Sequence, residues 1–144
     1  MTNRTFTIIK PNAVAAGNTG KILDMILNAG FKIRALKMVF MSRNEATRFY
    51  AIHQGKPFFA DLVEFMTSGP VIVGILEKEN AVAALRELVG NTDPAKAAEG
   101  TIRRMFADSL TRNAIHASDS DENAQQEWSQ FFKPKEIMVA DYCL

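Results

Sequence analysis

The segment Val71-Ile72-Val73-Gly74-Ile75-Leu76 decides the fold, because it is a continuous apolar run of strand length. The turn residues Ser68-Gly69-Pro70 come directly before it. An uninterrupted apolar run bounded by turn residues is typical of a strand that is covered on both faces. The segment therefore predicts a central strand, and the rest of the chain has to supply neighbouring strands and amphipathic helices.

Two strands are predicted before this run and one after it. The segment Thr5–Ile9 is rich in β-branched and aromatic residues and ends at Lys10-Pro11, where proline is expected to stop both a strand and a helix. A short strand is expected around His116. The segment from Phe31 to Met41 alternates, and its two faces would carry Ile33, Ala35, Lys37 and Val39 against Lys32, Arg34, Leu36 and Met38.

Helical spacing of apolar residues predicts the remaining elements. The last helix would begin at Asp119, three residues before Glu122, which is the spacing of a capping box. The segment from Asn91 to Gly100 has no long apolar side chain and is predicted to be a functional or mobile loop. The other helices are expected at 22–29, from Ser42 to about His53, at 59–66, at 82–89 and at 102–107. This order reduces to βαββαβ, an α/β (α+β) ferredoxin-like sandwich with a four-stranded antiparallel sheet and helices over its faces.

Composition excludes several classes of protein. A chain of 144 residues is one domain by length, so residues 1–144 are expected to form a single domain. A net charge of +1 gives no reason to expect nucleic acid as the principal partner. No apolar run approaches the roughly 20 residues of a membrane span, and no secretory signal precedes Thr5. With Cys143 as the one cysteine, a cytoplasmic protein without disulfides is expected.

The chemistry centres on the segment Asn113–Asp121, which sets His116 in a short apolar run before hydroxyl and carboxylate groups. An imidazole just before a helix N-terminus lies where backbone N–H groups favour an anion. A core or turn histidine is the alternative interpretation of His116 taken alone. Gly20-Lys21 is not a phosphate loop, because a Walker motif requires other residues at Ala15 and Ile22.

Cations and neutral hydrogen-bonding groups collect at the ends of the predicted elements. No pair of carboxylates suits glycoside hydrolysis, and His53 and His116 lack metal-ligand spacing. One histidine with several phosphate-matched cations suits phosphoryl transfer through the imidazole itself. Each of these groups taken alone could instead belong to a solvated helix face or pack in the core. The groups are Lys10, Lys56, Arg86, Arg103, Arg104 and Arg112, with Tyr50, Thr92, Asn113 and Ser118.

Six segments in register carry a family resemblance across the whole chain. They are Ile9-Lys-Pro-Asn-Ala-Val14, Gly55-Lys-Pro-Phe-Phe59, Met66-Thr-Ser-Gly-Pro70, Gly90-Asn-Thr-Asp-Pro94, Gly100-Thr-Ile-Arg103 and Asn113-Ala-Ile-His-Ala-Ser-Asp-Ser120. With these segments the chain resembles the nucleoside diphosphate kinases. The resemblance implies the ferredoxin-like fold and a phosphotransferase that moves the γ-phosphate of a nucleoside triphosphate to a nucleoside diphosphate. It also implies a ping-pong reaction through a phosphohistidine.

The resemblance assigns the catalytic groups. His116 would be the nucleophile, and Glu127 resembles the acid that orients its imidazole. Ser118 resembles the hydroxyl near the same histidine, and Tyr50 resembles the tyrosine beside the phosphate path. Lys10 would lie near the transferred phosphate.

The resemblance also assigns the nucleotide ligands. Arg86, Thr92 and Arg103 look like the phosphate ligands, since guanidinium groups match phosphate oxygens bidentately. Lys10 and Asn113 resemble the groups that bind the ribose hydroxyls. Stacking tolerates every base, and Phe58 resembles the stacking residue. Mg²⁺ is the implied cofactor, held mainly by the nucleotide's phosphates and without a protein metal cage.

Two departures from the family pattern bear on rate rather than on function. Ala117 stands where glycine is usual, and a positive φ there would cost strain of about 1 kcal/mol. Arg104 replaces a small residue. The resemblance further implies a homo-oligomer, a tetramer or hexamer built from dimers, in which the tail from Lys133 to Leu144 influences the choice. A catalytically silent regulatory or binding module on the same fold is the alternative function.

Overall fold

The computed structural model describes residues 3–143 and contains a four-stranded antiparallel sheet in the order β2-β3-β1-β4. β3 pairs with both β2 and β1, so the apolar run that begins at Val71 is a central strand, as predicted. The strands are β1 (Arg4–Ile9), β2 (Lys32–Val39), β3 (Val71–Glu77) and β4 (Ile115–Ala117). The predicted ferredoxin-like arrangement is confirmed.

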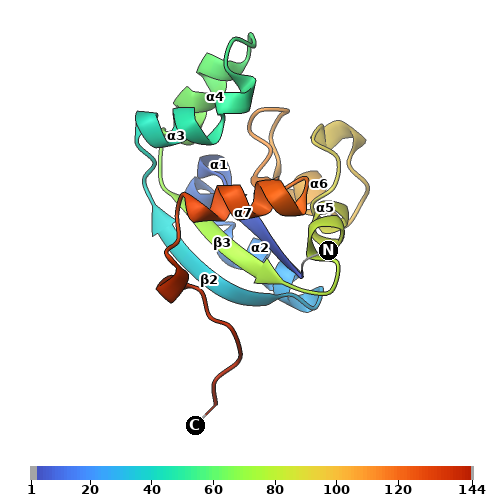
Figure 1. Cartoon of the computed structure of the whole chain (residues 1–144). Helices are drawn as coiled ribbons and strands as arrows, with labels where there is room; N and C mark the ends of the chain where they lie inside the picture. The colour runs from blue at the N-terminus through green and yellow to red at the C-terminus, as the bar shows by residue number, and fades with distance from the viewer. Residues whose placement is uncertain (1–2, 144) are drawn as a thin grey trace.

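Helices cover both faces of this sheet, with α7 across one face and α2 behind the other (Figure 1). No helix among the described residues is long and apolar enough to cross a membrane. The α-helices are α1 (Pro11–Ala15), α2 (Thr19–Asn28), α3 (Arg43–Phe49), α4 (Phe59–Met66), α5 (Ala81–Val89), α6 (Ile102–Phe106) and α7 (Asp121–Ser129). Three single-turn 3₁₀ helices lie at Ala51–His53, Pro94–Lys96 and Pro134–Glu136.

Alternation along β3 builds two separate cores. Val71, Val73 and Ile75 face the α7 side, while Ile72 and Leu76 face the α2 side. The α7-side core adds residues of α3, α4 and the chain after α7: Ala46, Val63, Phe65, Met66, Phe131 and Phe132. The α2-side core adds residues of α1, α2, α5 and α6: Ala13, Ile22, Ile26, Ala81, Leu85, Val89 and Ile102. The continuous apolar pattern of β3 follows from burial on both faces.

Gly74 is the one small residue of β3, and close packing explains it. A Cβ added there would lie 3.1 Å from Cδ1 of Leu36 and 3.3 Å from the carbonyl oxygen of Ala35. The neighbouring strand β2 therefore occupies the space that a larger side chain would need.

β2 differs from its predicted pattern. The pairing of β2 with β3 shifts register between Ile33 and Ala35, so Arg34 forms a bulge. As a result Ile33 packs against the α2-side core while Ala35 belongs to the α7-side core. The prediction that these two side chains share a face was wrong, because one extra residue in a strand reverses the alternation after it.

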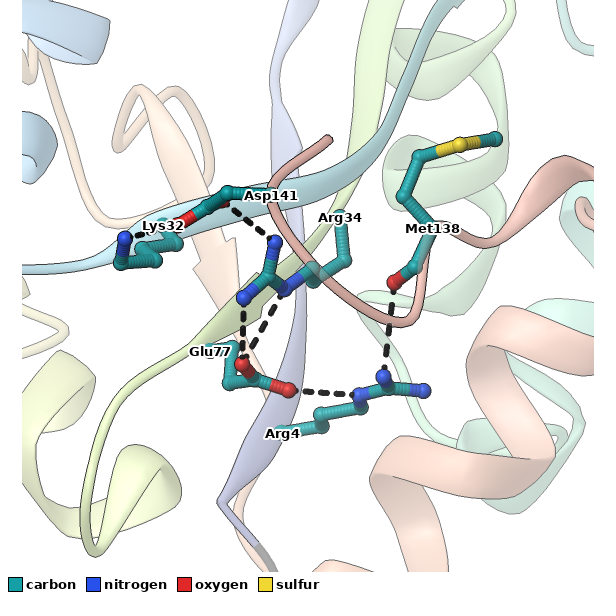
Figure 2. Close-up of polar contacts among 6 residues, drawn as sticks. All are labelled: Arg4, Lys32, Arg34, Glu77, Met138 and Asp141. Atoms are coloured by element: carbon teal, nitrogen blue, oxygen red, sulfur yellow. Dashed lines mark hydrogen bonds and ion pairs between the residues drawn. The ribbon is translucent and has the colours of Figure 1, made fainter. Parts of the chain in front are cut away.

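The bulge directs Arg34 toward the C-terminal segment. The Arg34 carbonyl accepts a hydrogen bond from the Met138 amide at 2.8 Å, and its guanidinium contacts both Glu77 and Asp141 (Figure 2). Arg4 joins the same network through Glu77 and the Met138 carbonyl. Asp141 also pairs with Lys32. The tail is therefore attached to the outer edge of its own sheet at the start of β2.

Two helix starts also differ from expectation. Pro11 is the first residue of α1, because a proline lacks the N–H that is unsatisfied at that position anyway. The proline ends β1 as predicted but starts a helix. The N-cap of α7 is Ser120, whose side chain accepts from the Asn123 amide at 3.1 Å, and not Asp119.

Candidate active site

The short strand β4 presents His116 on the α7 side of the sheet. Its neighbours Ile115 and Ala117 belong to the α2-side core, so alternation turns the imidazole to the opposite face. His116 pairs with Ile8 of β1. The His116 carbonyl accepts a hydrogen bond from the Thr7 hydroxyl at 2.8 Å. A central strand therefore holds the backbone of this histidine.

Glu127 of α7 fixes one nitrogen of the imidazole. Nε2 of His116 lies 2.8 Å from Oε1 of Glu127, and the Ser118 hydroxyl donates to the same oxygen at 2.6 Å. Because a carboxylate only accepts, Nε2 carries the proton and Nδ1 keeps its lone pair. Nδ1 has no hydrogen-bonding partner among residues 3–143. The three predicted residues of this group thus lie together.

Two cavities meet beside His116, and Arg86 and Ala117 line both of them. The larger cavity has a volume of about 680 Å³ and is lined by His116, Glu127 and Tyr50 among others. The smaller has a volume of about 210 Å³ and is lined by Thr92 and Arg103. The predicted nucleophile and the predicted phosphate ligands therefore border one connected region.

The guanidinium of Arg103, which lies in α6, is held at the site by two backbone carbonyl groups. Nη1 donates to the Gly90 carbonyl at 3.0 Å, and Nη2 donates to the Ile115 carbonyl at 2.9 Å. Burial lowers the pKa of Arg103 to about 10, with a smaller contribution from the Arg86 charge, so the group stays charged at neutral pH. Its Nε is buried without a partner.

Gly90 has to be glycine for this arrangement. Its φ is +90°, and an added Cβ would lie 2.6 Å from the Thr101 hydroxyl oxygen. A side chain at this position would displace the start of α6, which carries Arg103. The turn after α5 is therefore part of the site.

Lys10 and Asn113 form a buried pair at the start of α1. Nζ of Lys10 donates to Oδ1 of Asn113 at 2.8 Å, and the Asn113 amide donates to the Thr92 carbonyl at 3.4 Å. Burial lowers the pKa of Lys10 to about 7, and the Arg103 charge adds to the effect. No described carboxylate pairs with Lys10, Arg86 or Arg103. Their positive charge is available to an anion.

The backbone strain lies at Ala114 and not at Ala117. Ala114 has a φ of +75°, and among the described residues only Asn80 shares a positive φ without being glycine. Ala117 is an ordinary strand residue paired with Thr7, so the strain considered for it is absent. The Ala114 carbonyl accepts a hydrogen bond from the Lys10 amide at 2.8 Å. This bond secures the strained turn that leads into β4.

Tyr50 and Phe58 lie at the edges of the larger cavity. The Tyr50 hydroxyl is buried and has no partner. Burial raises the pKa of Tyr50, and the charge of Glu127 adds to this effect. Phe58 is 46% exposed and does not line either cavity, but its ring lies 5.3 Å from the ring of His53, which does. Phe58 is thus an accessible aromatic ring next to a residue that lines the larger cavity.

Sequence reasoning missed Phe49 and Asn12 as parts of the site. The Phe49 ring lies 5.2 Å from the His116 ring, although Phe49 falls inside the helix predicted from Ser42 to about His53. The Asn12 amide donates to the Arg112 carbonyl at 3.0 Å and to Asp108 at 3.2 Å, next to the Lys10–Asn113 pair. Only the position of Asn12 two residues after Lys10 hints at this contact. Arg104 donates to the Ala95 carbonyl at 3.4 Å and lies at the edge of the loop.

Within residues 3–143, no group of three or more His, Cys, Asp or Glu side chains could hold a metal ion. The polar groups that converge are cations and neutral donors. These suit the oxygens of an anionic ligand, and a divalent ion carried by such a ligand fits beside them.

Comparison with known proteins agrees with this geometry. The family model of nucleoside diphosphate kinase matches residues 3–137. A nucleoside diphosphate kinase of Phenylobacterium zucineum is 54% identical over 138 residues, which cover 96% of this chain and 99% of that protein. One of Nitratiruptor sp. is also 54% identical, over 94% of this chain and 98% of that protein.

Solved structures give the same result. The nucleoside diphosphate kinase of Aquifex aeolicus superposes with a TM-score of 0.93 at 45% identity, over 96% of this chain and all of that chain. A halophilic nucleoside diphosphate kinase from Halobacterium salinarum, solved in complex with CDP, has a TM-score of 0.93 at 36% identity, covering 99% and 95% of the two chains. The chain belongs to the nucleoside diphosphate kinase family.

Proposed function

We propose that this kinase transfers the γ-phosphoryl group of a nucleoside triphosphate, typically ATP, to a nucleoside diphosphate through a phosphohistidine on Nδ1 of His116. The observation that carries the proposal is the 2.8 Å contact between Nε2 of His116 and Glu127. This contact fixes the tautomer whose free lone pair is on Nδ1. His116 and Arg86 line the same cavity, so a phosphate bound by Arg86 would lie within the cavity that Nδ1 of His116 faces.

The first half-reaction forms one bond and breaks one. The Nδ1 lone pair attacks the γ-phosphorus, and the bond to the bridging oxygen breaks with its electron pair leaving on the nucleoside diphosphate. The imidazole becomes a cation that keeps its proton on Nε2, and the Glu127 carboxylate stabilises this charge. In the second half-reaction a β-phosphate oxygen of the acceptor attacks the phosphorus. The N–P bond then breaks and returns its electron pair to Nδ1.

The cations act by position and charge. Arg86, Arg103 and the Thr92 hydroxyl would bind the phosphate oxygens, where guanidinium groups offer bidentate contacts. Lys10 would donate to the transferred phosphate and, with Asn113, to the ribose hydroxyls. The negative phosphate would favour the charged form of Lys10, whose pKa burial lowers to about 7.

Two further groups complete the nucleotide site in this proposal. Tyr50 supplies a buried hydroxyl without a partner at the phosphate path. Phe58 supplies an exposed ring for the base, and stacking on a ring does not select one base over another.

Mg²⁺ is the proposed cofactor, and the nucleotide's phosphates would hold most of its ligand positions. The absence of a carboxylate cage among the described residues is compatible with an ion that keeps several waters. When bound, Mg²⁺ neutralises charge on the β- and γ-phosphates. Arg86 and Arg103 then have to bind only the remaining phosphate oxygens.

The proposal extends to organisation and assembly. Residues 1–144 would act as one kinase domain in the cytoplasm, where the nucleotide pools are. A homo-oligomer of dimers is proposed because the edge strand β2 and the adjacent α2 expose Leu27, Leu36, Met38 and Phe40. Sedimentation of the wild type and of Met38→Lys tests this, since a charge in a buried contact is expected to dissociate the dimer.

Intact-protein mass after mixing with ATP and Mg²⁺ tests the mechanism directly. The wild type is expected to gain one phosphoryl group, which GDP then removes, and His116→Ala is expected to gain none. His53→Ala is the matched control, because it removes the other histidine of the larger cavity and should still be phosphorylated. No gain in the wild type under conditions that preserve acid-labile phosphate would favour a silent binding module instead.

A further inference from the structure

The imidazole of His116 lies against an aromatic wall that the mechanism above does not use. The Phe49 ring lies 5.2 Å from the His116 ring at an interplanar angle of 79°, and the Phe6 ring lies 6.3 Å away at 58°. Phe6 is two residues from Ile8, the partner of His116 in the sheet, so it shares the face of the histidine. Phe49 comes from the last position of α3.

The hydrogen bond to Glu127 decides between the two ring orientations that differ by 180°, because rotation by 180° about the Cβ–Cγ bond would put Cε1 in the place of Nε2 and lose the contact. A single hydrogen bond leaves smaller rotations about the Cβ–Cγ bond open. The intrinsic preference for this torsion is broad. Ser118 also donates to the same Glu127 oxygen, so that oxygen is already partly satisfied. Packing has to supply the remaining restraint.

Phe49 is built to supply it. Its ring contacts three other aromatic rings: Tyr50 at 4.9 Å, Phe131 at 5.9 Å and Phe6 at 6.0 Å. A ring held by three neighbours is a fixed surface, and a nearly perpendicular contact with His116 excludes intermediate ring orientations. The contact with Tyr50 also ties the wall to the phenol at the phosphate path.

We infer that Phe49 is a positioning residue that restricts rotation of the His116 ring and thereby keeps Nδ1 directed at the phosphorus. The inference rests on the proposed phosphohistidine mechanism. Phe49 also lines the larger cavity, but its ring contacts are with the imidazole and with other aromatic rings, so we expect its loss to affect the transfer step more than binding. A misplacement on the ångström scale at a nucleophile is costly because the reacting atoms need a near-attack geometry.

The test compares Phe49→Leu with Phe131→Leu. Both variants lose one ring of the same aromatic cluster, but Phe131 has no ring contact with His116. The measurements are kcat and KM for ATP with GDP as acceptor, and phosphorus NMR of the alkali-denatured phosphoprotein, which distinguishes Nδ1 from Nε2 phosphohistidine. Phe49→Tyr keeps the ring and serves as the rescue variant.

Phe49→Leu is expected to lower kcat on the order of tenfold with KM unchanged, while the phosphoryl group stays on Nδ1 because Glu127 still holds Nε2. Phe131→Leu should lose little kcat, and Phe49→Tyr should restore kcat. Equal kcat values for the two leucine variants would overturn the inference. A wild type without any phosphohistidine would instead contradict the proposed function, so the two failures are distinguishable.

Discussion

Two buried cations at different places in the fold have opposite surroundings. Lys10 is 6% exposed and Arg34 is 7% exposed. Lys10 donates to a neutral amide oxygen, and burial together with Arg103 lowers its pKa to about 7. Arg34 contacts two carboxylates, and the hydrogen bonds that it donates, first to Glu77 and then to Asp141, raise the pKa of Arg34 (Figure 2).

The presence or absence of a carboxylate partner distinguishes Arg34, a structural charge, from Lys10, a functional one. At the β2 edge each cation of the network pairs with a carboxylate, and these pairs attach the tail to the sheet. Among the described residues, Lys10, Arg86 and Arg103 at the β4 end contact only amide and backbone oxygens. Arg86 is exposed but Lys10 is buried, and burying a charge without a counter-ion costs free energy, which an anionic substrate recovers on binding. The charged form of Lys10 is therefore destabilised in the absence of phosphate and stabilised by it.

A carboxylate placed beside Lys10 should give this lysine the kind of counter-ion that Arg34 has. Asn113→Asp places a carboxylate at the 2.8 Å contact with Lys10, which neutralises the cation and repels phosphate. We expect kcat/KM for ATP to fall about 100-fold. Asn113→Ala is the control, since it removes the same contacts but leaves the charge free, and a loss of about tenfold is expected. Equal losses in a steady-state assay would contradict this account.

The pKa of Lys10 predicts a pH dependence of stability. Between pH 7 and pH 10.5 the unfolded chain binds more protons at this lysine than the folded chain does. The free energy of unfolding should therefore rise with pH across this window, by at most about 1.4 kcal/mol per pH unit. The measurement is urea denaturation without nucleotide at several pH values. Lys10→Met should remove this component, and an unchanged slope in that variant would show that Lys10 does not titrate there.

Glycine substitutions at two alanines test where the strain of the active-site strand lies. Ala117→Gly restores the residue usual in the family, yet it should lower stability by about 1 kcal/mol, since Ala117 is a buried strand residue without positive φ. Ala114→Gly relieves a φ of +75° and loses a buried methyl, so its net effect should be within about 0.5 kcal/mol of zero. Both are measured by urea denaturation, and a reversed order would place the strain at Ala117.

The smallest effect is expected at the tail. Asp141→Asn weakens the contacts with Lys32 and Arg34, and hydrogen exchange at the Met138 amide should become faster. The melting temperature and the kinase activity should stay the same, because Asp141 is itself exposed and Arg34 keeps its contact with Glu77. Asp24→Asn, which alters an exposed carboxylate on α2, is the control and should not change exchange at Met138. Loss of activity in Asp141→Asn would show that the tail supports the site.

Local pattern predicted the elements well and their junctions poorly. The helix from Phe59 to Met66 and the strand from Val71 follow directly from periodicity and turn residues. The bulge at Arg34 is not visible in the sequence, because the side chains that Arg34 contacts, Glu77 and Asp141, are 43 and 107 residues away. The helix that begins at Pro11 and the Ser120 cap depend on which backbone groups remain unpaired after the sheet forms.

The fold class, the family resemblance and the identity of the candidate groups around His116 all follow from the amino-acid sequence. Apolar periodicity and short motifs are properties of neighbouring residues, so they can be recognised without the fold. Three features require the folded chain: which nitrogen of His116 is free, that Lys10 lacks a counter-ion, and that Phe49 faces the imidazole. These depend on distances between residues far apart in the chain, and burial and pairing are set only when α3, α7 and β4 pack together.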